Sequence, residues 1–395
     1  MHCLVFPNQC AKRIQRNAGI QLKNCMISKN ETETDQRLAA WLSFPDNVRA
    51  HIKQRSMQTL GTETGNSQAA GVIAAIARAE FPKAMWPELM ANLVTGAMSP
   101  QAPEQARVAA LQCIGYICEN EDDSLQASAN QILNGVTTCM RDEEPSQKVK
   151  LEAITTLELS LGFCDSQFQN EPDRNHIMTV VCKMSQNKDP EIQVKALQCL
   201  NAIMTQQYEL MVAYMKPALF GISMQAMQNE DEDVALQGIE FWSSVCETEM
   251  DLAEEEENAR RAGKEPAQAS LNYTQAAQQI LIPALLALME KQDEGDDPTE
   301  WGLSKAAHVC LKFLVETVRD SAVELIVPYI MQNIQNATWQ KRDTSVQAFG
   351  ALLDGSVKTL PHCHAETVPP FQSYLGKCSV LSFALPCSRD SYMCA

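Results

Sequence analysis

The sequence predicts an all-α protein in which helix pairs stack into an extended array. A short pattern recurs along the chain: a small residue, usually alanine, stands in an apolar helical stripe after an acidic or polar turn. One alanine per copy marks the register: Ala110, Ala153, Ala196, Ala235, Ala307 and Ala348. Successive marks lie 43, 43, 39, 72 and 41 residues apart, and a period of about 40 is typical of HEAT and armadillo repeats. A small residue lets helices approach closely, so each unit buries an apolar face against the next.

The first 118 residues predict the following elements, taken in order along the chain. Residues 1–16 show no clear repeat, and residues 17–29 fit the second helix of a unit. Residues 31–60 are helical in pattern, with a turn and a new helix start at Pro45 and Asp46. After a break at residues 61–66 come a small-residue helix (69–79), a first helix with prolines near its start (81–94) and its partner (105–118).

Three regular units follow. They pair residues 124–140 with 146–161, 172–184 with 190–204, and 208–227 with 233–250. The turns at residues 188–191 and 229–233 are acidic, which places aspartate where it caps the next helix and favours its positive end.

The 72-residue interval between Ala235 and Ala307 exceeds one period of about 40 by roughly 30 residues, which predicts one repeat unit with two insertions. Residues 251–268 are charged and form either a helix extension or a linker, while residues 270–291 form an apolar first helix. An acidic turn then precedes Trp301, and the last clear unit pairs residues 323–334 with 340–355. We therefore divide the chain into an atypical segment (1–16), a repeat array (17–355) with an acidic loop at 292–300, and a degenerate or altered segment (356–395).

Composition narrows the classes of function. The formal charge is −17, from 49 acidic and 32 basic residues, which argues against a nucleic-acid binder and suits a basic polypeptide partner. An acidic surface that only maintains solubility is the alternative. No apolar run reaches the ~18 residues that span a bilayer, and polar residues interrupt the first 22 positions, so neither membrane insertion nor a signal peptide is expected.

The 15 cysteines raise the question of disulfides. Cys113, Cys118, Cys182, Cys199 and Cys246 fall on the apolar faces of predicted helices. No CxxC pair exists, so buried reduced thiols are the preferred interpretation.

Catalytic and metal-binding patterns are missing. The chain has no GxxxxGK[ST], GxSxG or HExxH motif, and the His362–Cys363–His364 cluster matches no standard zinc spacing. We therefore expect no enzyme activity, metal or cofactor.

Several long segments resemble the importin-beta (karyopherin-beta) family of nuclear import receptors, in that family's order. They are TLGTET (59–64), MWPEL (85–89), IGYICE (114–119), EEPSQKVKL (143–151), YMKPALFGI (214–222), EDVALQGIEFWSSVCETEMDLA (232–253) and KQDEGDDPTEW (291–301). The resemblance covers residues 17–355, without most of the first repeat and the C-terminal half of the family.

The resemblance implies a right-handed superhelix of HEAT repeats that carries protein through the nuclear pore, between cytoplasm and nucleus. The implied partners are the GTP form of the GTPase Ran, importin-alpha or other basic cargo, and nucleoporins with Phe-Gly (FG) repeats. No direct nucleic-acid contact is implied.

The acidic turn matches the family's acidic loop, which touches Ran and basic cargo. Its carboxylates are Asp293, Glu294, Asp296, Asp297 and Glu300. Carboxylates this close together repel one another, and a basic partner relieves that repulsion in a salt-dependent way. A merely exposed polar turn is the alternative.

Two further sets carry over from the resemblance. Nucleoporin Phe side chains are expected between neighbouring outer helices, near Leu133, Thr137, Ile177, Tyr214 and Ile222; the alternative is that these residues only pack helices together. Glu247 and Trp301 match positions that face the basic segment of importin-alpha, because Trp stacks on Arg or Lys and Glu pairs with them.

Two other classes remain possible on sequence alone. A non-transport HEAT scaffold or adaptor for protein assembly shares the repeat pattern, although the acidic insertion beside Trp301 is foreign to it. An enzyme would need clustered catalytic side chains, which the sequence does not specify.

Overall fold

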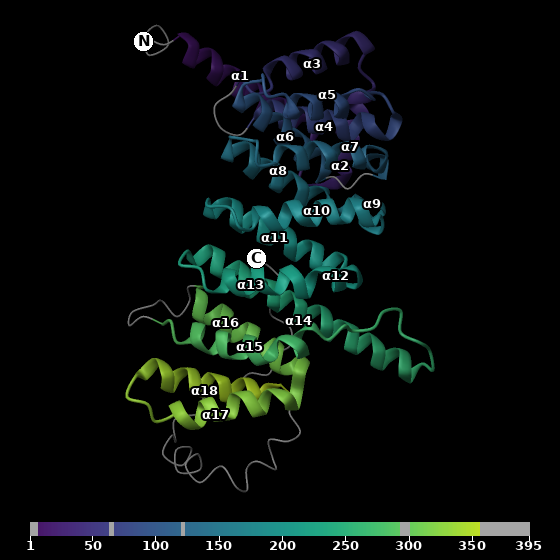
Figure 1. Cartoon of the computed structure of the whole chain (residues 1–395). Helices are drawn as coiled ribbons and strands as arrows, with labels where there is room; N and C mark the ends of the chain where they lie inside the picture. The colour runs from purple at the N-terminus through teal and green to yellow at the C-terminus, as the bar shows by residue number, and fades with distance from the viewer. Residues whose placement is uncertain (1–6, 63–66, 120–122, 293–300, 356–395) are drawn as a thin grey trace. The chain divides into compact units, whose positions relative to one another are not determined.

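A computed structural model of the chain describes residues 7–62, 67–119, 123–292 and 301–355. All regular structure within those ranges is helical, as predicted. The chain divides into two units, residues 1–273 and 274–395, which we describe separately (Figure 1). None of the described helices is long and apolar enough to cross a membrane.

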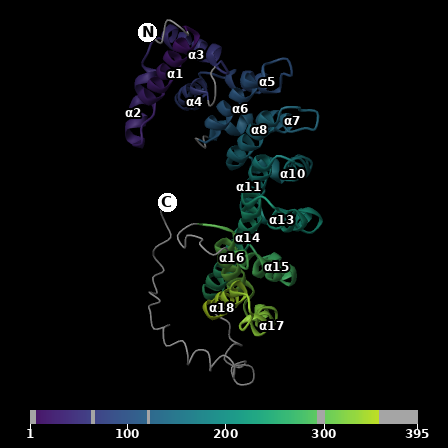
Figure 2. The ribbon, with the colours of Figure 1, turned by 90° about the vertical axis from the view of Figure 1, so that its left-hand side faces the viewer.

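Unit 1 contains two rows of helices. The second helices of successive repeats stack on one another in one row, and the first helices stand beside them in another (Figure 2). The second-helix row is α4 (Gln68–Glu80), α6 (Glu104–Cys118), α8 (Gln147–Ser160), α11 (Pro190–Gln206) and α14 (Glu232–Arg261). The first-helix row is α5 (Leu89–Met98), α7 (Ala129–Cys139), α10 (Glu171–Met184) and α13 (Phe220–Met227).

Shorter and N-terminal elements complete unit 1. They are α1 (Pro7–Met26), α2 (Glu31–Leu42), α3 (Asp46–Thr59), α9 (Asp165–Gln169) and α12 (Val212–Tyr214). Helix α1 begins at Pro7, inside the segment for which the sequence predicts no repeat.

Unit 2 contains α15 (Tyr273–Met289), α16 (Leu303–Val318), α17 (Val323–Asn333) and α18 (Trp339–Asp354). Helix α15 starts one residue before the unit boundary. Among the described residues only α15 intervenes between α14 and α16, as expected for one unit; the second predicted insertion lies almost wholly outside the described residues.

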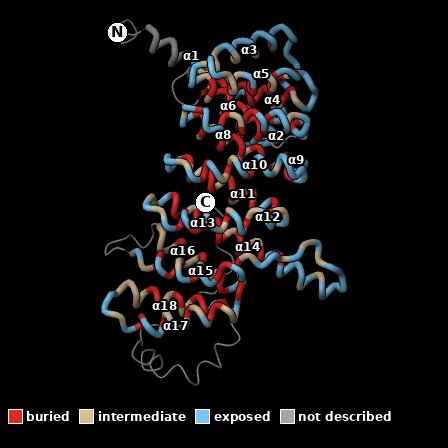
Figure 3. Tube along the Cα trace, in the orientation of Figure 1, coloured by how far each residue is buried: buried red, intermediate tan, exposed pale blue. Residues whose placement is uncertain are grey.

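The core lies where the two rows meet (Figure 3). All six register alanines are buried, with at most 3% of their surface exposed. At Gly238 α13 and α14 approach closely: a Cβ there would lie 2.6 Å from the backbone nitrogen of Met227. The small residues therefore have the packing role that the sequence predicts.

The repeat also appears in the hydrogen bonds. Side chains bond to the next repeat at separations of about one period, as from Gln112 to Glu152 (3.1 Å) and from Tyr208 to Glu249 (2.8 Å). In unit 2 the Tyr329 hydroxyl donates to Glu290 over the same interval (2.6 Å).

Two predicted segments differ in the structure, and a third, left open between two alternatives, is decided by it. The helix expected at residues 81–94 begins only at Leu89, because two prolines precede it and Ala84 takes a left-handed backbone (φ 52°). The helix expected at 208–227 is broken by a π-helical turn, Met215–Leu219, which contains Pro217, a residue without an N–H to donate. Residues 251–261 continue α14, so most of the first insertion is a helix extension.

The predicted caps are confirmed. Asp189 accepts a hydrogen bond from the backbone N–H of Glu191 at the start of α11, and Asp231 accepts one from Val234 at the start of α14. The described cysteines are all free. Burial raises the pKa of Cys182 to about 11 and of Cys164 to about 12, so these thiols stay protonated at neutral pH.

Candidate binding surfaces

Four of the five residues predicted to receive nucleoporin side chains lie on consecutive helices of the first-helix row, and the fifth lies on the short helix α12 that precedes α13. Leu133 and Thr137 belong to α7, Ile177 to α10, Tyr214 to α12 and Ile222 to α13. The structure places four of them in the row that the family resemblance implies, and the role of all five in binding stays a prediction.

Four of the five are buried. Leu133, Thr137, Ile177 and Ile222 are between 0% and 8% exposed. The Thr137 hydroxyl donates to the carbonyl oxygen of Leu133 (2.7 Å), one helical turn earlier, so it needs no partner outside its own helix. In this conformation these side chains hold helices together, and an aromatic ligand enters only if the slot beside them opens.

Tyr214 connects neighbouring first helices. Its hydroxyl accepts from Nε of Arg174 (3.3 Å) and donates to the amide oxygen of Asn175, both on α10. Ile222 lines a small cleft of about 60 Å³ whose rim is rich in amide side chains: Gln186, Gln193, Gln225 and Asn229. The rim of the cleft beside Ile222 is therefore mostly polar.

Glu247 belongs to an acidic face of α14. With Glu240 and Asp251 it occupies positions i, i+7 and i+11, which share one side of a helix. All three are exposed, and no described basic side chain forms an ion pair with any of them. Partial burial and then the charges of Glu240 and Asp251 raise the pKa of Glu247. A basic ligand on this face removes that repulsion.

The extension of α14 has the opposite electrostatic arrangement. Arg260 pairs with Glu256 (2.9 Å) and Glu257 (2.6 Å), and Arg261 pairs with Glu257 (3.1 Å). These acids are largely neutralised within their own helix. Glu240, Glu247 and Asp251 have no such ion pair with a described residue. Sequence reasoning identified Glu247 but missed Glu240 and Asp251, which their helical spacing reveals.

Trp301 precedes α16 in unit 2. It is 62% exposed, which is unusual for so large an apolar side chain and leaves a ring face open for stacking on a cation. The predicted acidic loop, Asp293, Glu294, Asp296, Asp297 and Glu300, lies outside the described residues, as does the His362–Cys363–His364 cluster. Within the described ranges, no group of His, Cys, Asp and Glu has the arrangement of a metal site.

Comparison with known proteins finds importin-beta relatives. No family model matches the chain. Importin subunit beta-1 of Schizosaccharomyces pombe is 39% identical over 346 residues, which cover 87% of this chain and 40% of the relative. The Saccharomyces cerevisiae protein of the same name is 33% identical over 86% of this chain and 40% of its own length. Over most of its length the chain is therefore homologous to importin subunit beta-1.

Solved structures of importin-beta have the same fold. Yeast importin-beta (Kap95p) superposes with a TM-score of 0.84 and 31% identity, over 90% of this chain and 41% of that one. Similar values hold for Kap95 in complex with Nup1 and for Kap95p bound to RanGDP, each with a TM-score of 0.81. The chain spans about 40% of the length of the importin-beta relatives it matches. The predicted HEAT-repeat solenoid fold is confirmed.

Proposed function

We propose that the chain acts as a nuclear import receptor, which carries proteins from cytoplasm to nucleus through pores of the nuclear envelope. The observation that carries the proposal is the 39% identity to importin subunit beta-1 over 87% of the chain. In this role the chain works by reversible binding, without catalysis, metal or cofactor. Its partners are the GTP form of Ran, FG-repeat nucleoporins, and importin-alpha or other basic cargo.

The structures of relatives support the first two partners. Kap95 has been seen with the nucleoporin Nup1 and with Ran, and this chain shares its fold at 31% identity over 90% of its length. The first-helix row offers the slots for nucleoporin side chains, near Leu133, Thr137, Ile177, Tyr214 and Ile222. The acidic loop supplies negative charge for Ran and for basic cargo.

The electrostatics of α14 support the third partner. Glu240, Glu247 and Asp251 form an unpaired acidic face, and a Lys- or Arg-rich segment is its natural complement. In unit 2, the exposed ring of Trp301 is a second, independent surface on which a Lys or Arg side chain can stack.

Capture of Ran tests the proposal directly. The immobilised chain is incubated with Ran loaded with GTP or GDP, at low and at high salt. We expect selective capture of the GTP form, weakened by salt because the contact is electrostatic. Equal or absent capture of both forms would contradict the proposal and favour a HEAT scaffold outside transport.

A matched pair of triple variants tests the acidic face. Replacing Glu240 and Glu247 by Gln and Asp251 by Asn removes three unpaired charges, and we expect weaker binding of a Lys/Arg-rich peptide. The control variant changes three exposed acids of unit 1 that lie outside α14 and has the same net charge: Glu88→Gln, Glu209→Gln and Glu265→Gln. Equal loss in both variants would show that only overall charge matters.

A second pair tests the nucleoporin slot. Tyr214→Ala removes the half-buried ring that joins α12 to α10, while Val212→Ala changes a side chain that is 59% exposed two residues earlier. We expect only the first variant to lose binding to an immobilised FG-repeat peptide. Retained binding would exclude Tyr214 from the slot.

A further inference from the structure

Three consecutive second helices begin with the same turn. In each, the side chain two residues before the N-cap accepts a hydrogen bond from the backbone N–H of the N-cap residue. The pairs are Glu144 with Ser146 on α8 (3.0 Å), Asn187 with Asp189 on α11 (2.9 Å) and Asn229 with Asp231 on α14 (2.9 Å). These three side chains therefore hold equivalent positions in successive repeats.

A second equivalent position faces each of them. It is the fourth residue of the preceding second helix: Arg107 on α6, Lys150 on α8 and Gln193 on α11. Arg107 forms a bidentate pair with Glu144, with one hydrogen bond at 3.1 Å and a second, shorter one. Gln193 accepts from the amide of Asn229 (3.4 Å). At two of the three repeat boundaries, the facing side chains satisfy each other.

The middle boundary differs. Lys150 lies 37 residues before Asn187, the same interval that separates Arg107 from Glu144. Asn187 carries no charge, and its amide oxygen is already bonded to the turn. Lys150 is only 6% exposed, and its ammonium has no hydrogen bond or ion pair with any described residue. The side chain is largely buried, and its ammonium, at the cleft, has no partner among the described residues, so this position favours an anion.

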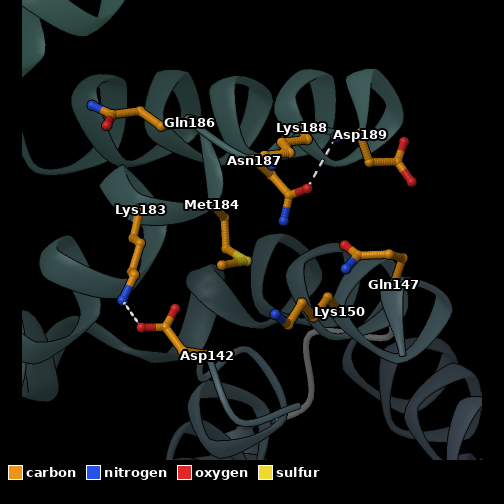
Figure 4. A pocket seen from close by; sticks show the side chains of 9 residues that line it. All are labelled: Asp142, Gln147, Lys150, Lys183, Met184, Gln186, Asn187, Lys188 and Asp189. Atoms are coloured by element: carbon orange, nitrogen blue, oxygen red, sulfur yellow. Dashed lines mark hydrogen bonds and ion pairs between the residues drawn. The ribbon is translucent and has the colours of Figure 1, made fainter. Parts of the chain in front are cut away.

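Lys150 opens into a cleft of about 670 Å³ between the start of α8 and the α10–α11 turn (Figure 4). Three lysines line it, namely Lys150, Lys183 and Lys188, against Asp142 and Asp189. Lys183 is paired with Asp142, and Asp189 caps α11. The lining has a net charge of +1, which matches a single carboxylate better than a multiply charged phosphate. The remaining lining side chains are one thioether and three amides: Met184, Gln147, Gln186 and Asn187.

From these observations we propose that the cleft between α8 and the α10–α11 turn binds an acidic peptide segment, whose Asp or Glu carboxylate pairs with Lys150. The peptide's carboxylate takes the place that Glu144 holds for Arg107 one repeat earlier. The amides of Gln147 and Asn187 lie beside it and can bond the peptide backbone, while Met184 supplies an apolar contact. The site shares Gln186 with the cleft beside Ile222, but it prefers a ligand of the opposite charge to basic cargo.

The test uses the whole chain with its methionine methyl groups labelled with ¹³C. The Met184 resonance, assigned from Met184→Leu, reports on the cleft. The probe is a capped five-residue peptide with one Glu, compared with the same peptide carrying Gln or phosphoserine. We expect a saturable shift of Met184 with the Glu peptide and none with the Gln peptide.

Two variants and a control link that shift to Lys150. Lys150→Met removes the ammonium, and Asn187→Asp places a carboxylate of the protein beside Lys150. Each substitution is expected to weaken binding of the Glu peptide about tenfold to a hundredfold. Lys148→Gln changes an exposed lysine two residues earlier, whose side chain is 78% exposed, and is expected to leave affinity unchanged.

Three results would overturn the proposal: no shift of Met184 with the Glu peptide, affinity that survives both Lys150→Met and Asn187→Asp, or a phosphoserine peptide that binds more than about tenfold tighter than the Glu peptide.

Discussion

The boundary between α6 and α8 and the boundary between α8 and α11 have the same arrangement of residues, but only the first pairs its basic side chain with an acid. Both place a basic side chain four residues into a second helix, facing the residue that holds the next turn. At the first boundary Glu144 bonds the turn and also neutralises Arg107. At the second, Asn187 bonds the turn but leaves Lys150 without an acid. The residue at the position of Glu144 or Asn187 thus decides whether the basic side chain at a repeat boundary is paired within the protein or is left to bind an external acid.

Breaking the satisfied boundary has the largest expected effect. Glu144→Asn copies the next repeat, keeps a side chain that can hold the turn, and leaves the Arg107 guanidinium buried without its carboxylate. Removing one partner of a buried pair costs about 3–5 kcal/mol. Urea unfolding followed by circular dichroism measures the change, with Lys148→Gln as the surface control. A loss below about 1 kcal/mol would contradict the importance of this pair.

Completing the open boundary is the reciprocal change. Asn187→Asp supplies a carboxylate to Lys150 and keeps an oxygen for the turn. We expect a gain in unfolding free energy of about 1.5–3 kcal/mol, the usual range for a charge-assisted hydrogen bond. The same urea experiment measures it, and the gain should disappear in the double variant with Lys150→Met. A gain that persists there would arise from something other than the pair.

The α13–α14 contact tests whether close backbone packing matters as much as the boundary side chains. Gly238→Ala places a methyl group 2.6 Å from the Met227 nitrogen and 2.9 Å from the Ser223 carbonyl oxygen. Backbone atoms cannot move aside easily, so we expect a loss of about 1–3 kcal/mol, read as a lower thermal midpoint. Gly221→Ala is the control, because a Cβ there meets nothing within 4 Å. Equal effects of the two substitutions would refute the packing argument.

The smallest expected effect is that of the acidic face. The pKa of Glu247 is raised by partial burial and by Glu240 and Asp251, so its charged form is disfavoured in the folded protein. The charged side chain therefore destabilises the folded protein at pH values above the pKa that Glu247 has in the folded state. This destabilisation is lost as the pH falls below the ordinary pKa of a glutamate. Glu247→Gln should therefore stabilise the protein slightly at pH 7, with the difference vanishing near pH 4. A difference that grows on acidification would have the wrong sign.

Much of the fold could be predicted from the sequence because its signals are local and repeated. The register alanines, the helical stripes and the acidic caps such as Asp189 and Asp231 depend on a few neighbouring residues, and the structure confirms them. The π-helical turn at Met215–Leu219 was missed because the apolar pattern runs straight through Pro217.

The binding surfaces were harder to predict. Ile177 and Ile222 match the expected row, yet their burial depends on neighbouring helices that no local pattern describes. Lys150 and Asn187 lie 37 residues apart, and only the geometry of two turns brings them together. Their significance appears when the equivalent pair, Arg107 and Glu144, is seen beside them.

The most direct test of the proposed transport role is accumulation at the nuclear pore. Fluorescently labelled chain is added to permeabilised cells and imaged at the nuclear envelope, with Tyr214→Ala as the variant and Val212→Ala as its control. The account predicts a bright nuclear rim for the wild-type chain and for Val212→Ala, and a weaker rim for Tyr214→Ala. Exclusion of the wild-type chain from the rim would contradict the account.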